Sequence, residues 1–192
     1  MKVAYVFWYM LLYPLARLIV PCVVKGRENI PQGAVIVCAN HTNILDPVLI
    51  AYAFGRKCQL FFMAKAELFK VPIVGSIFKT VGVFPIVRGE TDINSIRTAM
   101  KHLKNGDKIM MFPEGTRVKE DDLVAAKSGA VRIAAKMKVP VLPIHLSKGK
   151  KAFKQSKLVI GEPYMLQTPT DKNYAPLISE LMDKIHALEF RS

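Results

Sequence analysis

The stretch 34–54 reads AVIVCANHTNILDPVLIAYAF and contains two patterns in succession. The continuous apolar run 34–39 follows a Pro-Gln-Gly turn and has the length of a buried strand. Residues 47–54 begin with a proline, which is favoured in the first turn of a helix. We therefore predict a buried strand, a polar loop and a helix, in that order. This succession is the building unit of α/β proteins.

The rest of the chain repeats this alternation. Apolar runs with the length of strands occupy 59–64, 83–87, 108–112, 139–146 and 157–160, and helical spacing occupies 73–80, 91–104, 128–138 and 176–190. Strands that alternate with helices favour a single layered α/β domain, with a mostly parallel or mixed sheet flanked by helices. Proline cannot donate a ladder hydrogen bond, so the two prolines in 139–146 predict a strand near an edge or an irregular one.

Composition limits the function classes. The chain has 192 residues, is 51% hydrophobic, and carries a formal charge of +13 from 28 basic and 15 acidic residues. Such a charge predicts an anionic partner, which is nucleic acid, anionic lipid or a phosphorylated substrate. The apolar N-terminus suits a lipid enzyme and argues against nucleic acid. The segment 148–157 holds five lysines, which form either a solvated loop or a contact for anionic headgroups.

The N-terminal segment 3–24 is almost entirely apolar. A helix of that length would span roughly 33 Å, just enough for a bilayer core, but Pro14 and Arg17 interrupt it. Three interpretations stay open: an interfacial helix that dips into the membrane, a spanning helix, and a helix packed on the domain. We expect a membrane-associating segment at 1–24 and the catalytic domain at 25–192. The basic residues that follow the segment predict that this domain faces the cytoplasm.

The chain has three cysteines, Cys22, Cys38 and Cys58, all in apolar surroundings and without CxxC spacing. Their number and spacing fit neither a disulfide framework nor a metal site. We expect reduced thiols packed as small hydrophobic side chains, as in a cytosolic domain. The absence of HExxH or Cys/His spacing predicts that no metal is bound.

His41 and Asp46 stand between the predicted strand and the predicted helix. In one continuous helix, an offset of five residues leaves two side chains about 140° apart, so the connection has to curl for them to meet. Asp46 precedes Pro47, which predicts that Asp46 is the N-cap of the helix. An aspartate that accepts from one imidazole nitrogen leaves the other nitrogen as a base. The same spacing also occurs by chance, with Asp46 as a simple cap.

A second polar loop, FPEGTR at 112–117, follows the predicted strand 108–112. Glycine permits a tight backbone, and the planar fork of Arg117 matches a phosphate group. Two polar loops that each follow a strand are expected at the carboxyl edge of the sheet, where α/β proteins place their chemistry.

Together these motifs resemble those of the glycerophospholipid acyltransferases, specifically the 1-acylglycerol-3-phosphate O-acyltransferases. Four blocks carry the resemblance in order: NHTNILD (40–46), GVFPIVRG (82–89), FPEGTR (112–117) and VPVLPIHL (139–146). The similarity extends over nearly the whole chain from about residue 24. Members of the family often have aspartate directly before the arginine of the second block, where this chain has Val87.

The resemblance implies roles for particular residues. His41 is the general base that takes a proton from the sn-2 hydroxyl of the acceptor, and Asp46 orients it. The hydroxyl attacks the acyl thioester directly, without an acyl-enzyme. The groups that bind the glycerol phosphate are Glu114, Gly115, Thr116 and Arg117, with Arg88 as a second phosphate partner. Lys65, at the end of the strand 59–64, is expected within reach of the same pocket.

The expected acceptor is lysophosphatidic acid, and the product is phosphatidic acid. The acyl donor is acyl-CoA or acyl carrier protein, and no other cofactor is expected. Three alternatives stay open: an acyltransferase for another lysolipid, a phosphate-ester hydrolase, and a membrane-binding module without catalysis.

Overall fold

The computed structural model describes residues 3–87, 92–115 and 126–189. In chain order the elements are α1 (Val3–Ile19), β1 (Cys22–Lys25), η1 (Arg27–Asn29), β2 (Val35–Ala39), α2 (Asp46–Phe54), β3 (Leu60–Lys65), η2 (Ala66–Lys70), α3 (Pro72–Val81), β4 (Val83–Ile86), α4 (Ile93–Lys104), β5 (Lys108–Met111), α5 (Gly129–Met137), β6 (Val141–Leu146), β7 (Ser156–Ile160) and α6 (Ala175–Ala187).

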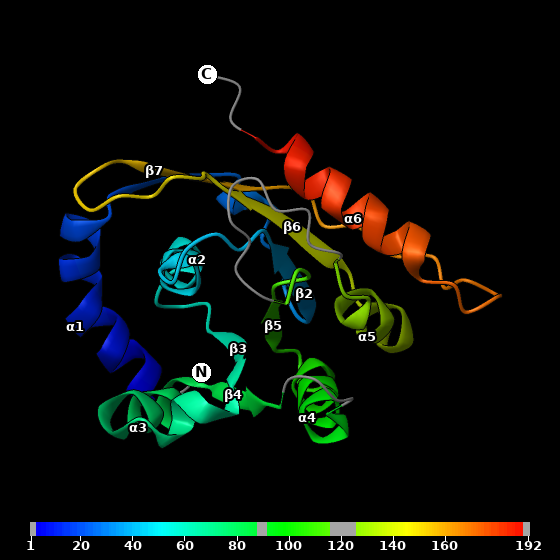
Figure 1. Cartoon of the computed structure of the whole chain (residues 1–192), viewed down its shortest axis with the longest axis horizontal. Coiled ribbons are helices and arrows are strands. Elements are labelled where there is room, and N and C mark those ends of the chain that lie inside the picture. The colour runs from blue at the N-terminus through cyan, green and yellow to red at the C-terminus, as the bar shows by residue number, and fades with distance from the viewer. Residues whose placement is uncertain (1–2, 88–91, 116–125, 190–192) are drawn as a thin grey trace.

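The strands form a single sheet with the order β1-β7-β6-β2-β5-β3-β4. Neighbours from β6 to β4 are parallel, whereas β7 is antiparallel to β6 and β1 is parallel to β7. The sheet is therefore mixed with a parallel centre. Helices cover it on both sides, as Figure 1 shows, and the predicted α/β class is confirmed.

The central strand β2 alternates its side chains between two cores. Val35, Val37 and Ala39 pack with the buried side chains of α2 on one face of the sheet. Ile36 and Cys38 pack on the other face, with side chains of α4, α5 and α6. Because both faces are covered, β2 is apolar at every position, as is typical of a parallel strand inside a sheet.

The position of β6 corrects one prediction. The prolines in 139–146 predicted an edge or irregular strand, yet β6 lies inside the sheet between β2 and β7. Pro143 is tolerated because the pairing of β6 with β7 begins one residue later, at Ile144. The carbonyl of Pro143 still accepts the N–H of Gly161, just beyond the end of β7.

The N-terminal segment divides into a helix and a strand. Residues 22–24, which we assigned to the hydrophobic segment, belong to β1 and pair with β7. The helix α1 packs against α3, and Figure 1 shows the two side by side. The buried Tyr5 donates its hydroxyl to the carbonyl of Gly55 at 3.2 Å.

The outward side of α1 is apolar. Val3, Phe7, Leu11, Leu15 and Leu18 are exposed and recur every three or four residues, and the exposed Met10 and Leu12 flank this stripe. Among the helices in the described parts of the chain, none is both long enough and apolar enough to cross a membrane. Association of this helix with a membrane surface stays a prediction.

Candidate active site

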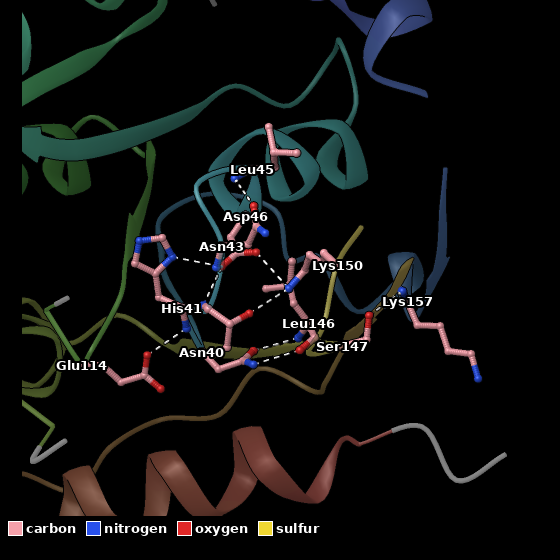
Figure 2. A network of polar contacts seen from close by, with 11 residues as sticks. Asn40, His41, Asn43, Leu45, Asp46, Glu114, Leu146, Ser147, Lys150 and Lys157 are labelled. Atoms are coloured by element: carbon pink, nitrogen blue, oxygen red, sulfur yellow. Dashed lines mark hydrogen bonds and ion pairs between the residues drawn. The ribbon is translucent and has the colours of Figure 1, made fainter. Parts of the chain in front are cut away.

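The candidate site lies at the carboxyl edge of the sheet, where β2 leads into α2 (Figure 2). Asn40, the residue directly after β2, is buried and joins this loop to the end of β6. Its side-chain amide donates to the carbonyl of Leu146 at 2.9 Å and accepts the Leu146 N–H at 2.8 Å. Through these two bonds, the Asn40 side chain continues the β2–β6 pairing beyond the end of β2 and holds the start of the loop in place.

The loop 41–45 curls around the carboxylate of Asp46. One oxygen, Oδ2, accepts the backbone N–H of Thr42 at 2.8 Å and that of Asn43 at 2.7 Å. The same oxygen lies 3.0 Å from Nδ1 of His41. The prediction that the connection curls until His41 meets Asp46 is therefore confirmed.

The prediction that Asp46 caps the helix is wrong. The helix α2 already includes Asp46, and its N-cap position is Leu45, which makes no side-chain cap hydrogen bond. The carboxylate points back toward the preceding loop instead of forward along the helix. Its oxygens are engaged there by two backbone N–H groups, by His41 and by Lys150.

The imidazole of His41 is held in a defined orientation. Its ring stacks on Phe112 with centroids 4.0 Å apart and an interplanar angle of 20°. An ionised carboxylate can only accept a hydrogen bond, so in the neutral ring the proton between the two groups resides on Nδ1. Nε2 then carries the lone pair that a general base requires.

Several opposing effects act on the ionisation of Asp46. Burial alone would raise the pKa of its carboxyl group, but the hydrogen bond with His41, the ammonium of Lys150 and the N–H of Asn43 outweigh it. The net result is a pKa below the usual value of 3.8. Asp46 is therefore ionised at neutral pH although its side chain is fully buried.

Lys150 is a site residue that the sequence did not reveal. Its Nζ lies 3.0 Å from Oδ1 of Asp46 and donates to Oγ1 of Thr42 at 3.0 Å. Its position after β6 was a usable signal, because β6 is parallel to β2 and ends at the same edge. The sequence places it among the five lysines of 148–157, from which its residue type does not distinguish it.

Glu114 connects the second loop to the first. Its Oε2 accepts the backbone N–H of His41 at 2.8 Å, and the side chain is buried. Burial raises the pKa of this carboxyl group, against the opposing effects of the bond from His41 and of nearby positive charge. Glu114 thus helps to place His41, and its expected contact with the acceptor stays a prediction.

Gly115 allows the second loop to turn. Its N–H donates to the carbonyl of Phe112 at 2.9 Å, and its φ of +67° lies in the left-handed region that glycine tolerates best. A Cβ at this position would approach the side chain of Lys127 to 3.1 Å. The predicted tight turn is therefore confirmed.

Of the four remaining predicted residues, Lys65 alone lies in the described part of the chain. Lys65 is exposed at the carboxyl end of β3, two strands away from β2 along the same edge. Arg88, Thr116 and Arg117 lie outside the described residues. Over the parts of the chain that are described, no group of three His, Cys, Asp or Glu side chains could hold a metal ion.

A histidine held by a buried carboxylate, at the carboxyl edge of an α/β sheet, has the geometry that general-base catalysis requires. The sequence profile described as Acyltransferase matches residues 21–147, which include both loops and β6. The match covers more than half of the chain, so this protein belongs to the acyltransferase family.

Sequence comparison with individual proteins gives the same family. The 1-acyl-sn-glycerol-3-phosphate acyltransferase of Bacillus subtilis (strain 168) is 36% identical over 177 residues, covering 86% of this chain and 87% of that protein. The corresponding protein of Borreliella burgdorferi is 33% identical over 132 residues, which are 65% of this chain and 50% of that protein.

A solved structure is also similar. The crystal structure of the 1-acyl-sn-glycerophosphate (LPA) acyltransferase, PlsC, from Thermotoga maritima superposes with a TM-score of 0.69 at 30% identity. The superposition covers 89% of this chain and 73% of that chain. The similarity therefore extends beyond the motifs to the whole arrangement of the sheet and helices.

The state of Asp46 predicts how stability depends on pH. Because its pKa is lower in the folded protein than in the unfolded chain, the carboxylate stabilises the fold above about pH 4. That contribution is lost as the pH falls through the folded-state value. We expect Asp46→Asn to lower the free energy of unfolding at pH 7 by about 3–5 kcal/mol, since it leaves Lys150 buried without its carboxylate.

The difference between wild type and Asp46→Asn should shrink below about pH 4. Urea unfolding followed by circular dichroism measures it. Asp183→Asn, on the exposed side of α6, is the control and should change stability by less than about 0.5 kcal/mol at pH 7. A constant difference down to pH 3 would contradict an ionised Asp46.

Proposed function

We propose that this acyltransferase moves a fatty acyl group from an acyl thioester to the sn-2 hydroxyl of 1-acylglycerol-3-phosphate, giving phosphatidic acid for phospholipid biosynthesis. One observation carries the proposal: Nδ1 of His41 bonds to a buried, ionised Asp46, which leaves Nε2 available for a hydroxyl proton. The names of the similar proteins support the choice of this acceptor.

The reaction needs one base and two proton transfers. Nε2 of His41 removes the proton as the acceptor oxygen attacks the thioester carbonyl carbon. A tetrahedral intermediate forms, the C–S bond breaks, and the departing thiolate takes the proton from the imidazolium. Asp46 stabilises the imidazolium between these two steps, because its carboxylate stays ionised beside the ring.

Direct transfer is supported by the state of the cysteines. All three are free, as expected. Cys38, the nearest in sequence to His41, is fully buried, and this burial raises the pKa of its thiol far above the usual range. Burial also raises the pKa of Cys22 to about 11. A thiol in that state is a poor nucleophile at neutral pH, which favours attack by the acceptor itself.

The acceptor proposal includes its phosphate group. Arg88 and Arg117 are proposed to bind it through their planar guanidinium forks, with Thr116 and Gly115 beside them. Lys65, on the same edge of the sheet, is proposed to add positive charge. The donor is proposed to be acyl-CoA or acyl carrier protein, both anionic, which suits a chain with a formal charge of +13.

We further propose that the protein works at the cytoplasmic surface of a membrane. The acceptor is a lipid, and the exposed apolar side of α1 offers leucine and phenylalanine side chains to the acyl region. The exposed lysines of 148–157, such as Lys151 and Lys154, are proposed to contact anionic headgroups. Phe153, which is highly exposed, lies in that segment and its N–H bonds to the carbonyl of Ile19 at the end of α1.

Replacement of His41 tests the reaction. We expect His41→Ala to lower transfer from a labelled acyl thioester to lysophosphatidic acid about 10²- to 10⁴-fold, because the base is lost. Transfer is measured on lipid vesicles, with acyl-CoA and acyl carrier protein donors in parallel. The control is His186→Ala, an exposed histidine of α6, which should retain wild-type activity.

Unchanged transfer in His41→Ala would rule out His41 as the base. An assay without the acyl donor separates the reaction from phosphate-ester hydrolysis. Release of phosphate from lysophosphatidic acid under that condition would favour a hydrolase instead.

Replacement of an exposed leucine tests membrane association. Burying one leucine side chain in lipid stabilises binding by about 1.5–3 kcal/mol, so Leu11→Glu should weaken binding to anionic vesicles at least about tenfold. Vesicle flotation measures the bound fraction. Ile93→Glu is the control, since Ile93 is equally exposed but lies at the start of α4. Equal effects of both replacements would contradict a docking role for α1.

A further inference from the structure

Lys150 carries a buried charge that the reaction described above does not use. Its side chain is only 1% exposed, and its Nζ lies 3.0 Å from Oδ1 of Asp46. A buried ammonium is costly unless it is paired and hydrogen-bonded. Here it has both kinds of partner, because it also donates to the hydroxyl of Thr42 at 3.0 Å. Figure 2 shows the lysine head group reaching Asp46 from the side opposite His41.

The two oxygens of Asp46 therefore have separate partners. Oδ2 receives Nδ1 of His41 and the N–H groups of Thr42 and Asn43, all from the loop before the helix. Oδ1 receives Lys150 from the loop after β6. A carboxylate can rotate about its Cβ–Cγ bond, and a single contact on each side is enough to oppose that rotation. Lys150 supplies the contact on the side that the loop does not reach.

The backbone around Lys150 is itself fixed. The N–H of Ser147 donates to the carbonyl of Lys157, and the N–H of Lys157 donates to the Ser147 hydroxyl, both at 3.0 Å. Further along, the N–H of Ser156 donates to the carbonyl of Pro21 at 2.7 Å. Because the loop is held at both ends, the ammonium of Lys150 is placed before the substrate arrives.

We propose that Lys150 is a positioning residue for acyl transfer, which holds the Asp46 carboxylate so that Oδ2 stays aligned with Nδ1 of His41. The proposal rests on the proposed function of His41 as the base. Lys150 cannot touch the acceptor, because its side chain is buried behind Asp46. Its loss is therefore expected to slow the chemical step and to leave substrate binding nearly unchanged.

Kinetic constants of Lys150 variants test the proposal. Loss of a group that orients an essential residue lowers activity about 10- to 100-fold. We expect a fall of that size in kcat for Lys150→Met, with KM values for donor and acceptor within about threefold of wild type. Lys150→Arg, which keeps the charge, should recover part of the loss. Lys136→Met, an exposed lysine of α5, is the control for loss of one positive charge.

A double replacement separates positioning from general destabilisation. If Lys150 acts through Asp46, Lys150→Met should cause no further loss of kcat in the Asp46→Asn background. An equal loss in both backgrounds would overturn the proposal. Circular dichroism monitors folding, and if Lys150→Met does not fold, Lys150→Gln replaces it in both backgrounds with the same outcomes.

A spectroscopic measurement distinguishes failure of this proposal from failure of the proposed function. The proton between His41 and Asp46 should give a downfield NMR resonance, assigned by its absence in His41→Ala. We expect the resonance to persist in Lys150→Arg and to be lost or shifted in Lys150→Met, whichever acceptor the enzyme uses. An unchanged resonance in Lys150→Met would overturn the positioning role even if wild type transfers acyl groups. Suppose that the wild-type protein transfers no acyl groups but the resonance is still lost in Lys150→Met. That result would contradict only the proposed function.

Discussion

The arrangement of the site depends on one buried carboxylate. Asp46 has no exposed side-chain surface, and a buried charge is stable only when donors surround it. Three donors on Oδ2 come from the loop 41–43, and the ammonium of Lys150 forms an ion pair with Oδ1. Because this charge needs donors, the loop curls around it and His41 is held in one orientation. The loop that carries Lys150, more than a hundred residues further along the chain, also contacts the carboxylate. A neutral side chain at this position would impose none of these constraints.

The sheet makes that convergence possible. Because β2, β5 and β6 are parallel neighbours, the residues that follow them reach the same edge. Glu114 arrives after β5 and accepts the N–H of His41, while Lys150 arrives after β6. Each strand thus contributes one polar group to the positioning of a single imidazole. The stacking of Phe112 on the His41 ring adds an apolar wall on one side.

The apolar periodicity of the sequence was enough to predict the fold class and most strands, because buried parallel strands are continuous apolar runs. It failed where tertiary context decided the outcome. Pro143 lies inside the sheet because its missing donor coincides with the end of the β7 pairing, which no local pattern shows. Asp46 was expected to cap α2, as aspartate before proline usually does, but the neighbouring loop and Lys150 compete for its oxygens. Lys150 was hidden among similar lysines, since its burial is set by contacts distant in sequence.

The five-residue spacing between His41 and Asp46 does not by itself identify the site; the burial of the pair does. His102 and Asp107 have the same spacing as His41 and Asp46 and form a 2.8 Å pair, yet they precede β5 at the opposite edge of the sheet and are partly exposed. What distinguishes His41 is a fully buried, ionised carboxylate. The most direct test is therefore the tautomer of His41, measured from its ¹⁵N NMR shifts at a pH where the ring is neutral. We expect a proton on Nδ1 and a bare Nε2; a proton on Nε2 would contradict the role of His41 as a base oriented by Asp46.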